Sequence, residues 1–212
     1  MIQAFGVPKK TKENILDSAL KLFNEKGLVN VRLQHIADEA FISIGNMAYH
    51  YKNKEAIVHA IHELLESELK TLMAEMNVVP LFDYVNQYFE NSFRLQIKYA
   101  FFFTDMLEVF RSHPDIASKH SKLITWQKKQ YELMLEFNQN RGVFEILEIG
   151  NQKEHIVNQL WMVTYMFQSF RLIEGAKPNL KNYCDQIWSI FIPLMTERGL
   201  QEYKQLGSFS LI

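Results

Sequence analysis

The sequence predicts an all-α protein with a small N-terminal domain, residues 1–55, and a larger helical domain, residues 56–212. Apolar residues recur with the 3.6-residue period of a helix along almost the whole chain. No segment shows the two-residue alternation of a strand, and glycine, proline and asparagine interrupt the pattern at intervals that fit helix ends. Of the 212 residues, 48% are hydrophobic and 13% aromatic, which is enough for a sizeable core.

Composition and charge narrow the class of protein further. The net charge is −1, so the whole chain is not a general binder of polyanions. Cys184 is the single cysteine and cannot form an internal disulfide, which fits a reducing compartment. The N-terminus has no apolar run typical of a secretory signal, and no later segment has the roughly 20 apolar residues of a membrane span. We therefore expect a cytoplasmic protein with no membrane partner.

The first predicted helix runs from Thr11, which can cap it, to Lys26. Gly27 follows as a C-terminal stop. The apolar residues of this segment share one face of the helix, which predicts burial of that face. They are Ile15, Ala19, Leu22 and Phe23.

Three more helices follow. The second begins near residue 31 or 32. The third covers about residues 44–51, and the Ser43 hydroxyl can accept a hydrogen bond from its first turn. Asn53 can cap the fourth, Lys54 to about Met76, whose apolar stripe is long enough to connect the N-terminal domain to the rest of the chain.

The larger domain continues the helical pattern to the end of the chain. Helices are predicted over residues 81–99, 100–112, 115–140, 152–174 and 179–197, and a short one near Gln201. Helix-breaking residues separate them. These are Pro80, Pro114, Gly142, Gly150, Pro178 and Gly199.

The third helix carries the strongest functional signal. It is short and capped, and its first turn holds Ile44, Asn46 and Met47, which a helix of this size cannot bury. Helix-turn-helix proteins enter a DNA major groove with such a helix. Residues 11–57 resemble the DNA-binding domain of TetR-family transcriptional regulators. The matching positions are Ala19, Phe23, Gly27, Ile36, Ala37, Ala40, Ser43, Gly45, His50, Tyr51, Lys54 and Glu55.

The resemblance implies a set of DNA-binding residues, each with a physical role. Ser43 can donate to a phosphate, and Gly45 allows close backbone approach. Asn46 can read a base edge, and Ile44 can contact thymine methyl groups or simply pack. The rest of the set is Arg32, Met47, Tyr49, His50 and Lys54.

Met47, like Ile44, can contact thymine methyl groups or simply pack. Tyr49 and His50 fall where the family places phosphate contacts. Lys54, at a helix N-terminus, is a candidate phosphate clamp, and Arg32 can reach a phosphate if Asn30 caps the second helix. Lys9, Lys10 and Lys12 can add attraction that is independent of sequence.

Three positions depart from the family pattern. Phe41 stands where the family usually has glycine, so the turn geometry is expected to differ. Ala48 replaces a tyrosine, which removes one expected phosphate contact. Arg32 replaces the threonine or serine that usually opens the second helix.

The larger domain is rich in aromatic residues, which pocket walls and ordinary cores both use. The resemblance implies a pocket for a small effector here, and the few charges near these residues indicate a mostly apolar or aromatic ligand. The candidate lining residues are Phe89, Phe102, Phe103, Met106, Phe110, Trp126, Tyr131, Trp161 and Tyr165.

The last two long helices, residues 152–174 and 179–197, carry apolar side chains on more than one face. Surplus apolar surface fits a subunit interface. We expect a homodimer in which these helices form a four-helix bundle, an arrangement that the family also uses. Two recognition helices at fixed spacing would read a palindromic operator in double-stranded DNA.

Catalytic and metal chemistry have little support. His59, His62, Glu63 and Glu66 have helical spacing that can bind a metal, but a solvent-facing stripe is the preferred interpretation. We expect no cofactor and no enzymatic activity. The predicted function is a ligand-controlled transcriptional regulator, with repression as the expected sign of regulation. Two alternatives stay open: control by a protein partner, or a helical small-molecule-binding protein or enzyme with a vestigial DNA-binding domain.

Overall fold

The computed structural model describes residues 11–147 and 150–209, with side chains described to residue 206. These residues form helices and no β-strand, apart from an isolated bridge between Phe144 and Met195. The α-helices are α1 Thr11–Lys26, α2 Leu33–Glu39, α3 Ile44–His50, α4 Lys54–Met76, α5 Phe82–Lys98, α6 Ala100–Thr104, α7 Met106–Ser112, α8 Pro114–Asn140, α9 Gln152–Ile173, α10 Leu180–Phe191 and α11 Glu197–Phe209.

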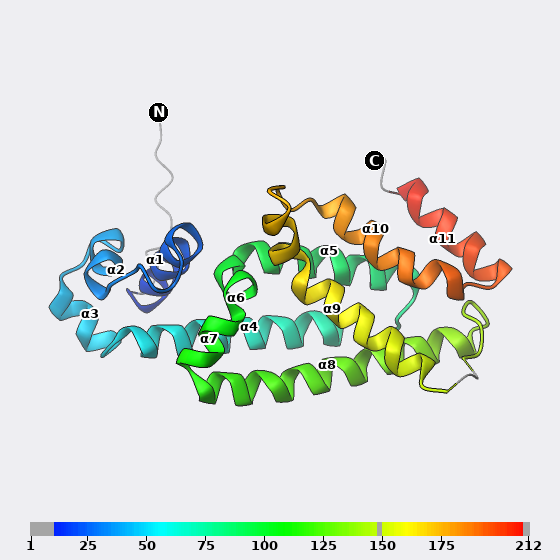
Figure 1. Ribbon diagram of the computed structural model, residues 1–212, viewed down its shortest axis with the longest axis horizontal. Helices are drawn as coiled ribbons and strands as arrows, with labels where there is room; N and C mark the ends of the chain where they lie inside the picture. Colours follow the sequence, from blue (N-terminus) through cyan, green and yellow to red (C-terminus); the bar gives the residue numbers. More distant parts are fainter. Residues whose placement is uncertain (1–10, 148–149, 210–212) are drawn as a thin grey trace.

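Figure 1 shows α1, α2 and α3 gathered at one end of an elongated molecule, with α4 running from them into the body. The reading head, defined here as residues 11–53, therefore joins the body through one continuous helix. No helix in the described part of the chain is long and apolar enough to cross a membrane.

The predicted N-caps at Ser43 and Asn53 and the predicted stop at Gly27 are confirmed. Ser43 Oγ accepts from the N–H of Asn46 at 3.1 Å, and Asn53 Oδ1 accepts from the N–H of Ala56 at 3.0 Å. Gly27 ends α1 with φ of +76°, a conformation that glycine adopts without strain. As a result, α1 and α4 have the bounds that the sequence predicted.

Two long helices that the sequence predicted are broken. Residues 100–112 form α6 and α7, which meet at Asp105 with φ −112° and ψ 21°. Residues 179–197 end as an α-helix at Phe191, because Pro193 lacks an N–H and the chain continues as a 3₁₀ turn over Ile192–Leu194. The helix near Gln201 is correspondingly longer than expected and begins at Glu197.

The expected role of Asn30 is also wrong. Its Nδ2 donates to the carbonyl of Lys26 at 2.8 Å, so this side chain closes α1 and does not cap α2. Arg32 is the N-cap residue of α2, and its N–H donates to His35 Nδ1 at 3.2 Å.

Two hydrophobic clusters fill the interior, and α4 contributes to both. The head-side cluster contains Ile57, Ile61 and Leu65 of α4 together with residues of α1–α3 and α5–α9. The second cluster, in the body, contains Met73 and Met76 of α4 with residues of α5 and α8–α10. The core of the head is therefore continuous with that of the body.

The contact between α1 and α6 also joins head and body. Asn24 Nδ2 donates to the carbonyl of Lys98 at 2.9 Å, and Asn24 Oδ1 accepts from the N–H of Phe101 at 2.9 Å. The Phe23 and Phe101 rings lie 5.2 Å apart between centroids. One amide of the head thus binds both sides of the junction between α5 and α6.

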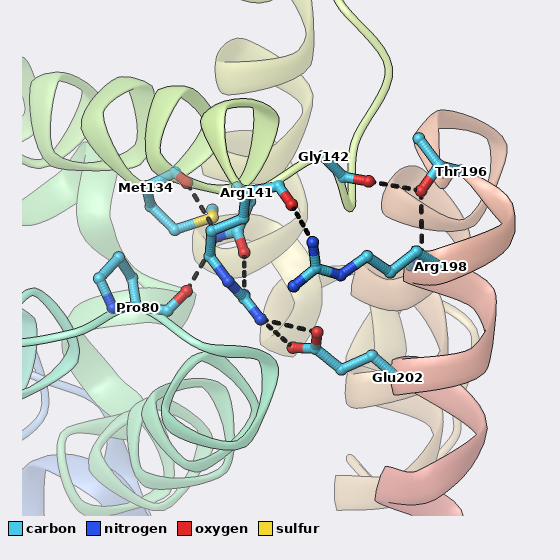
Figure 2. A network of polar contacts seen from close by, with 9 residues as sticks. Pro80, Met134, Arg141, Gly142, Thr196, Arg198 and Glu202 are labelled. Carbon is cyan, nitrogen blue, oxygen red and sulfur yellow. Dashed lines mark hydrogen bonds and ion pairs between the residues drawn. The ribbon is translucent and has the colours of Figure 1, made fainter.

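Helix α11 is fastened to the end of α8 by polar contacts (Figure 2). Arg141 Nη2 lies 2.7 Å and 2.9 Å from the two carboxylate oxygens of Glu202. Arg198 and Thr196 donate to the carbonyls of Arg141 and Gly142, both at 2.8 Å. Helix α11 also lies close to the backbone at Val143, since a Cβ at Gly199 would be only 2.1 Å from the Val143 carbonyl oxygen.

A pair of buried histidines joins α4 to α8. His62 Nε2 lies 3.1 Å from His120 Nδ1, and rings of Phe102, Phe110 and Tyr165 surround His120. The solvent-facing interpretation is therefore wrong for His62, which α8 covers. Burial lowers the pKa of His62, and burial followed by the proximity of His62 lowers the pKa of His120 to about 3.

We predict that the free energy of unfolding falls as the pH is lowered from 7 to 5. Both histidine pKa values are lowered from 6.5 by folding, so the unfolded chain binds more protons in this window. The stabilisation is complete above about pH 6.5 and is lost below it, by about 1–2 kcal/mol at pH 5. Urea unfolding at the two pH values measures the difference.

The non-ionisable His120→Gln should reduce this pH dependence, whereas Gln87→Ala at an exposed position on α5 should leave it unchanged. An H120Q variant with the full pH dependence of the wild type would contradict the assignment.

Candidate nucleic-acid interface

Helix α3 is held to the head by one side chain and exposes most of the others. Met47 is 0% exposed and belongs to the head-side cluster, which decides between its two predicted roles in favour of packing. Ser43, Gly45, Asn46 and Ala48 are exposed. The anchored helix therefore presents its first turn to solvent on a fixed backbone.

Two large side chains extend this exposed surface. Tyr49 is 85% exposed and Ile44 is also exposed, although both carry apolar carbon surface. The Tyr49 ring meets the half-buried His50 ring edge-on, with centroids 5.2 Å apart. These side chains with Ser43 and Asn46 offer hydroxyl, amide, imidazole and apolar groups, the kinds that contact phosphates and base edges.

The turn before α3 contains a non-glycine residue with a positive φ. Phe41 has φ of +57° and is 94% exposed. This is a conformation that glycine adopts without strain, whereas a residue with a Cβ costs about 1 kcal/mol more there, so the expected change of turn geometry stays a prediction.

Lys54 has a structural role that sequence reasoning missed. Its half-buried ammonium group donates to the carbonyls of Leu28 and Val31, both at 3.1 Å. These carbonyls belong to the loop between α1 and α2, so Lys54 holds the start of α2 against α4. These two contacts use two of the three donors of the ammonium group, so the phosphate contact expected for Lys54 stays a prediction.

Among the described residues, the other lysine and arginine side chains predicted to contact DNA are exposed, unlike the half-buried Lys54. Arg32 is exposed at the start of α2, and Lys12 is exposed in the first turn of α1. Lys9 and Lys10 lie outside the described residues. Asn14, which the sequence did not single out, donates to the carbonyl of Ala40 at 2.8 Å and fixes the end of α2 against α1.

The nine candidate effector residues do not form one group. Phe102, Phe103, Met106 and Tyr165 belong to the head-side cluster, whereas Phe89 and Tyr131 belong to the body cluster. Phe110 and Trp161 pack against the first cluster, and Trp126 packs against both. The sequence could not show this separation, because all nine are large aromatic or apolar side chains that either cluster could contain.

The candidate residues in both clusters are packed against their neighbours, and buried polar groups among them form hydrogen bonds. The Tyr88 and Tyr131 hydroxyls lie 2.9 Å apart, and the Tyr165 hydroxyl donates to Gln127 Oε1 at 2.5 Å. Trp161 stacks on Tyr165 with centroids 4.8 Å apart. His120 Nε2 and Trp161 Nε1 are buried without a hydrogen-bond partner in the described part of the protein.

Phe103 and Met106 also line a surface pocket of about 460 Å³ at the break between α6 and α7. Helix α9 forms the opposite wall with Met166 and Ser169. Burial, and then the nearby Glu108, raises the pKa of Asp105 at this break above its ordinary value. The remaining lining residues are Thr104, Leu107, Glu108 and Arg111.

The two helices of the predicted dimer interface differ in exposure. The stripe on α9 that faces solvent is apolar towards its C-terminal end, with Met162, Met166, Phe170 and Ile173 exposed. On α10 the expected stripe of Ile187, Trp188 and Phe191 is instead buried within the protomer, beneath α5, α9 and α11. The exposed side of α10 carries Gln186 and Ser189, and Ile192 and Pro193 are exposed in the 3₁₀ turn that follows it.

Sites for covalent or metal chemistry are not prominent. Burial raises the pKa of the half-buried Cys184 thiol to about 12, which keeps it protonated at neutral pH. The described side chains include no group of three or more His, Cys, Asp or Glu placed to hold a metal ion.

Comparison with known proteins identifies the family. Residues 15–61 match the model described as bacterial regulatory proteins, tetR family, and residues 64–203 match the TetR model described as bacterial transcriptional repressor. The chain belongs to the TetR family. The earlier resemblance of the head is thereby confirmed, and TetR-family membership extends through the body.

Individual relatives agree with this assignment. The chain is 35% identical over 63 residues to the probable HTH-type transcriptional regulator YttP of Bacillus subtilis, a match that spans 30% of that regulator. A TetR-family regulator from Marinobacter aquaeolei has the same fold, with a TM-score of 0.83, 20% identity, and coverage of 95% of this chain and 99% of the other.

SmeT, the repressor of the Stenotrophomonas maltophilia multidrug efflux pump SmeDEF, was solved in complex with triclosan. It has a TM-score of 0.62 and 17% identity, with 89% of this chain and 93% of SmeT covered.

We predict that adjacent residues of α3 separate stability from surface function. Met47→Ala should lower the free energy of unfolding by about 2–4 kcal/mol, because it leaves a cavity in the head-side cluster. Asn46→Ala removes an exposed amide and should change it by less than about 0.5 kcal/mol. Urea unfolding of both variants tests this, and equal destabilisation by the two would contradict the described orientation of α3.

Proposed function

We propose that this protein is a homodimeric transcriptional regulator that binds a palindromic operator through α3. The observation that carries the proposal is the short α3 helix, anchored by Met47 and exposing Ser43, Ile44 and Asn46, within a chain of the TetR family. The proposed sign of regulation is repression, as the description of the matching family model indicates. A protein with this function works in the cytoplasm, where bacterial DNA is located.

Each exposed residue of α3 has a proposed contact. Asn46 reads a base edge, for which an amide paired with adenine has suitable donors and acceptors. Ile44 contacts thymine methyl groups, and Gly45 allows close approach. Tyr49 and Ser43 bind phosphates.

The residues around these complete the interface. Although Asn30 does not cap α2, the Arg32 side chain is exposed at the start of that helix and adds a phosphate contact. His50 borders the surface beside Tyr49. Lys54 also acts indirectly, because it positions the loop that leads into α2.

The dimer would use the exposed stripe of α9. Met162, Met166 and Phe170 form an apolar row that water contacts in the single chain, and pairing would remove it from water. A hollow between the start of α9 and the end of α10, lined by His155, Gln159 and Pro193 among others, continues this face. Two heads held by a twofold dimer would meet two half-sites of a palindrome.

The effector would bind at the break between α6 and α7. Its pocket there has apolar walls from Phe103, Met106 and Met166, which fits a mostly apolar or aromatic ligand. The triclosan complex of SmeT supports this ligand class by analogy of fold. The signal would pass from α6 to the head through Asn24, which binds the N-terminus of α6, and through α4.

The effector changes operator affinity only if it binds one arrangement of α6 and α4 more tightly than the other. A moderate difference in this affinity is sufficient, since about 1.4 kcal/mol changes an equilibrium tenfold.

The main test uses fluorescence anisotropy to measure binding of the purified protein to the duplex upstream of its own gene, at two salt concentrations. We expect preference over a scrambled duplex and weaker binding at higher salt. Asn46→Ala should reduce affinity by about 5–100-fold, because it removes a base contact worth about 1–3 kcal/mol.

Gln87→Ala, at an exposed amide on α5, is the matched control and should bind as the wild type does. Equal affinity of the wild type for both duplexes would count against this operator. Undiminished binding by the Asn46, Tyr49 and Ser43 alanine variants would refute the proposed interface.

A separate prediction concerns the dimer. Met162→Asp places a carboxylate in the apolar row of α9 at a position that does not line the proposed effector pocket, so the protein should sediment as a monomer and lose most of its affinity for a palindrome. Leu133→Asp, at an exposed apolar position on α8, is the control and should stay dimeric. A dimeric M162D protein would place the interface elsewhere.

A further inference from the structure

Phe41 lies in the turn between α2 and α3, in a conformation that its own side chain disfavours. Its φ is +57°, and among residues 11–147 and 150–209 no other non-glycine residue has a positive φ. The turn uses this conformation to end α2: the N–H of Phe41 donates to the carbonyl of Asp38 at 3.1 Å, and that of Ile42 donates to Ala37 at 3.0 Å. Glycine would adopt it without strain.

Packing within the protein does not offset this strain. The Phe41 side chain is 94% exposed, the highest value among the exposed large hydrophobic side chains of the described residues. The neighbouring Ile42 packs against the head-side cluster instead. A strained position with an aromatic ring entirely in water indicates that the ring is used in contact with another molecule.

The place of Phe41 in the head indicates which molecule this is. Phe41 precedes the N-cap residue Ser43 by two positions, and the exposed Ile44 and Asn46 follow in the first turn of α3. The ring therefore stands at the edge of the surface that α3 presents. When the first turn of such a helix enters a major groove, the residues that flank it meet the sugar–phosphate backbone along the groove.

We propose that Phe41 is a DNA-contacting residue whose ring packs against deoxyribose carbons of the backbone bordering the groove that α3 enters. This inference rests on the proposed function, and it assigns the turn itself to the interface. The contact is apolar, so it adds affinity without neutralising a phosphate. It also explains why a strained phenylalanine occupies the turn, since glycine would supply the conformation but not the ring.

The proposal predicts opposite effects on folding and on binding. Phe41→Gly and Phe41→Asn fit a positive φ but lack the ring. Both should bind operator DNA about 5–20-fold more weakly, while their melting temperatures stay unchanged or rise by about 2–4 °C. The slope of binding against salt concentration should equal that of the wild type, because no cation is lost. Phe41→Tyr keeps the ring and should keep the affinity.

The experiment begins with selection of duplexes from a random-sequence pool by the full-length wild-type protein. Affinities of the three Phe41 variants for the selected duplex are then measured by fluorescence anisotropy at three salt concentrations, with melting temperatures alongside. Val29→Ala is the matched control, because it trims another exposed apolar side chain of the head, in the loop between α1 and α2. It should bind as the wild type does.

Wild-type affinity in F41G, or an equal loss in F41Y and F41G, would overturn the proposal and leave DNA binding by α3 intact. A loss in F41G with a reduced salt slope would also overturn it, because an apolar contact releases no counterions. If the wild type selects no duplex, DNA binding itself fails, and the role of Phe41 fails with it.

Discussion

Helix α4 is buried in two places along one face, and the rest of the structure depends on this. Its first half lies in the head-side cluster, where Ile57, Ile61 and Leu65 are almost completely buried. Met73 and Met76 near its end are buried in the body cluster. Close-packed interiors resist gradual deformation, so any shift of α4 must rearrange contacts in both clusters together. A change in the body therefore cannot occur without effect on the head.

Polar contacts fix the angle at which the head meets this helix. Lys54 satisfies the carbonyls of Leu28 and Val31, and Asn24 satisfies the carbonyl of Lys98 and the N–H of Phe101. Such backbone groups are costly to leave without partners, typically by about 1–3 kcal/mol each when buried. The two side chains lie on different elements, α4 and α1, so together they define the orientation of the head. The His62–His120 contact similarly joins α4 to α8 on its other side.

Local signals in the sequence were sufficient for much of the head. The Ser43 and Asn53 caps and the Gly27 stop act on adjacent backbone, so their consequences could be predicted without tertiary structure. The roles of Lys54 and His62 could not be predicted in this way, because their partners come from residues 28, 31 and 120. The break at Asp105 is not visible in the sequence, because three consecutive phenylalanines hide the helical period. Trp188 and Phe191 lie in the segment predicted for the dimer interface and are instead covered within the protomer. The sequence pattern shows that a face is buried and not what covers it.

The continuity of the head-side cluster has a practical consequence for recombination between regulators. A chimera that joins the first 55 residues to another body would separate Phe23 and Asn24 from Phe101, and Ile15 and Ala19 from the α4 residues of the same cluster. Exchange of operator specificity between members of such a family is therefore better made by grafting the exposed positions of α3 than by swapping segments. A segment swap would have to carry α6 along with the head, although more than forty residues of chain separate them.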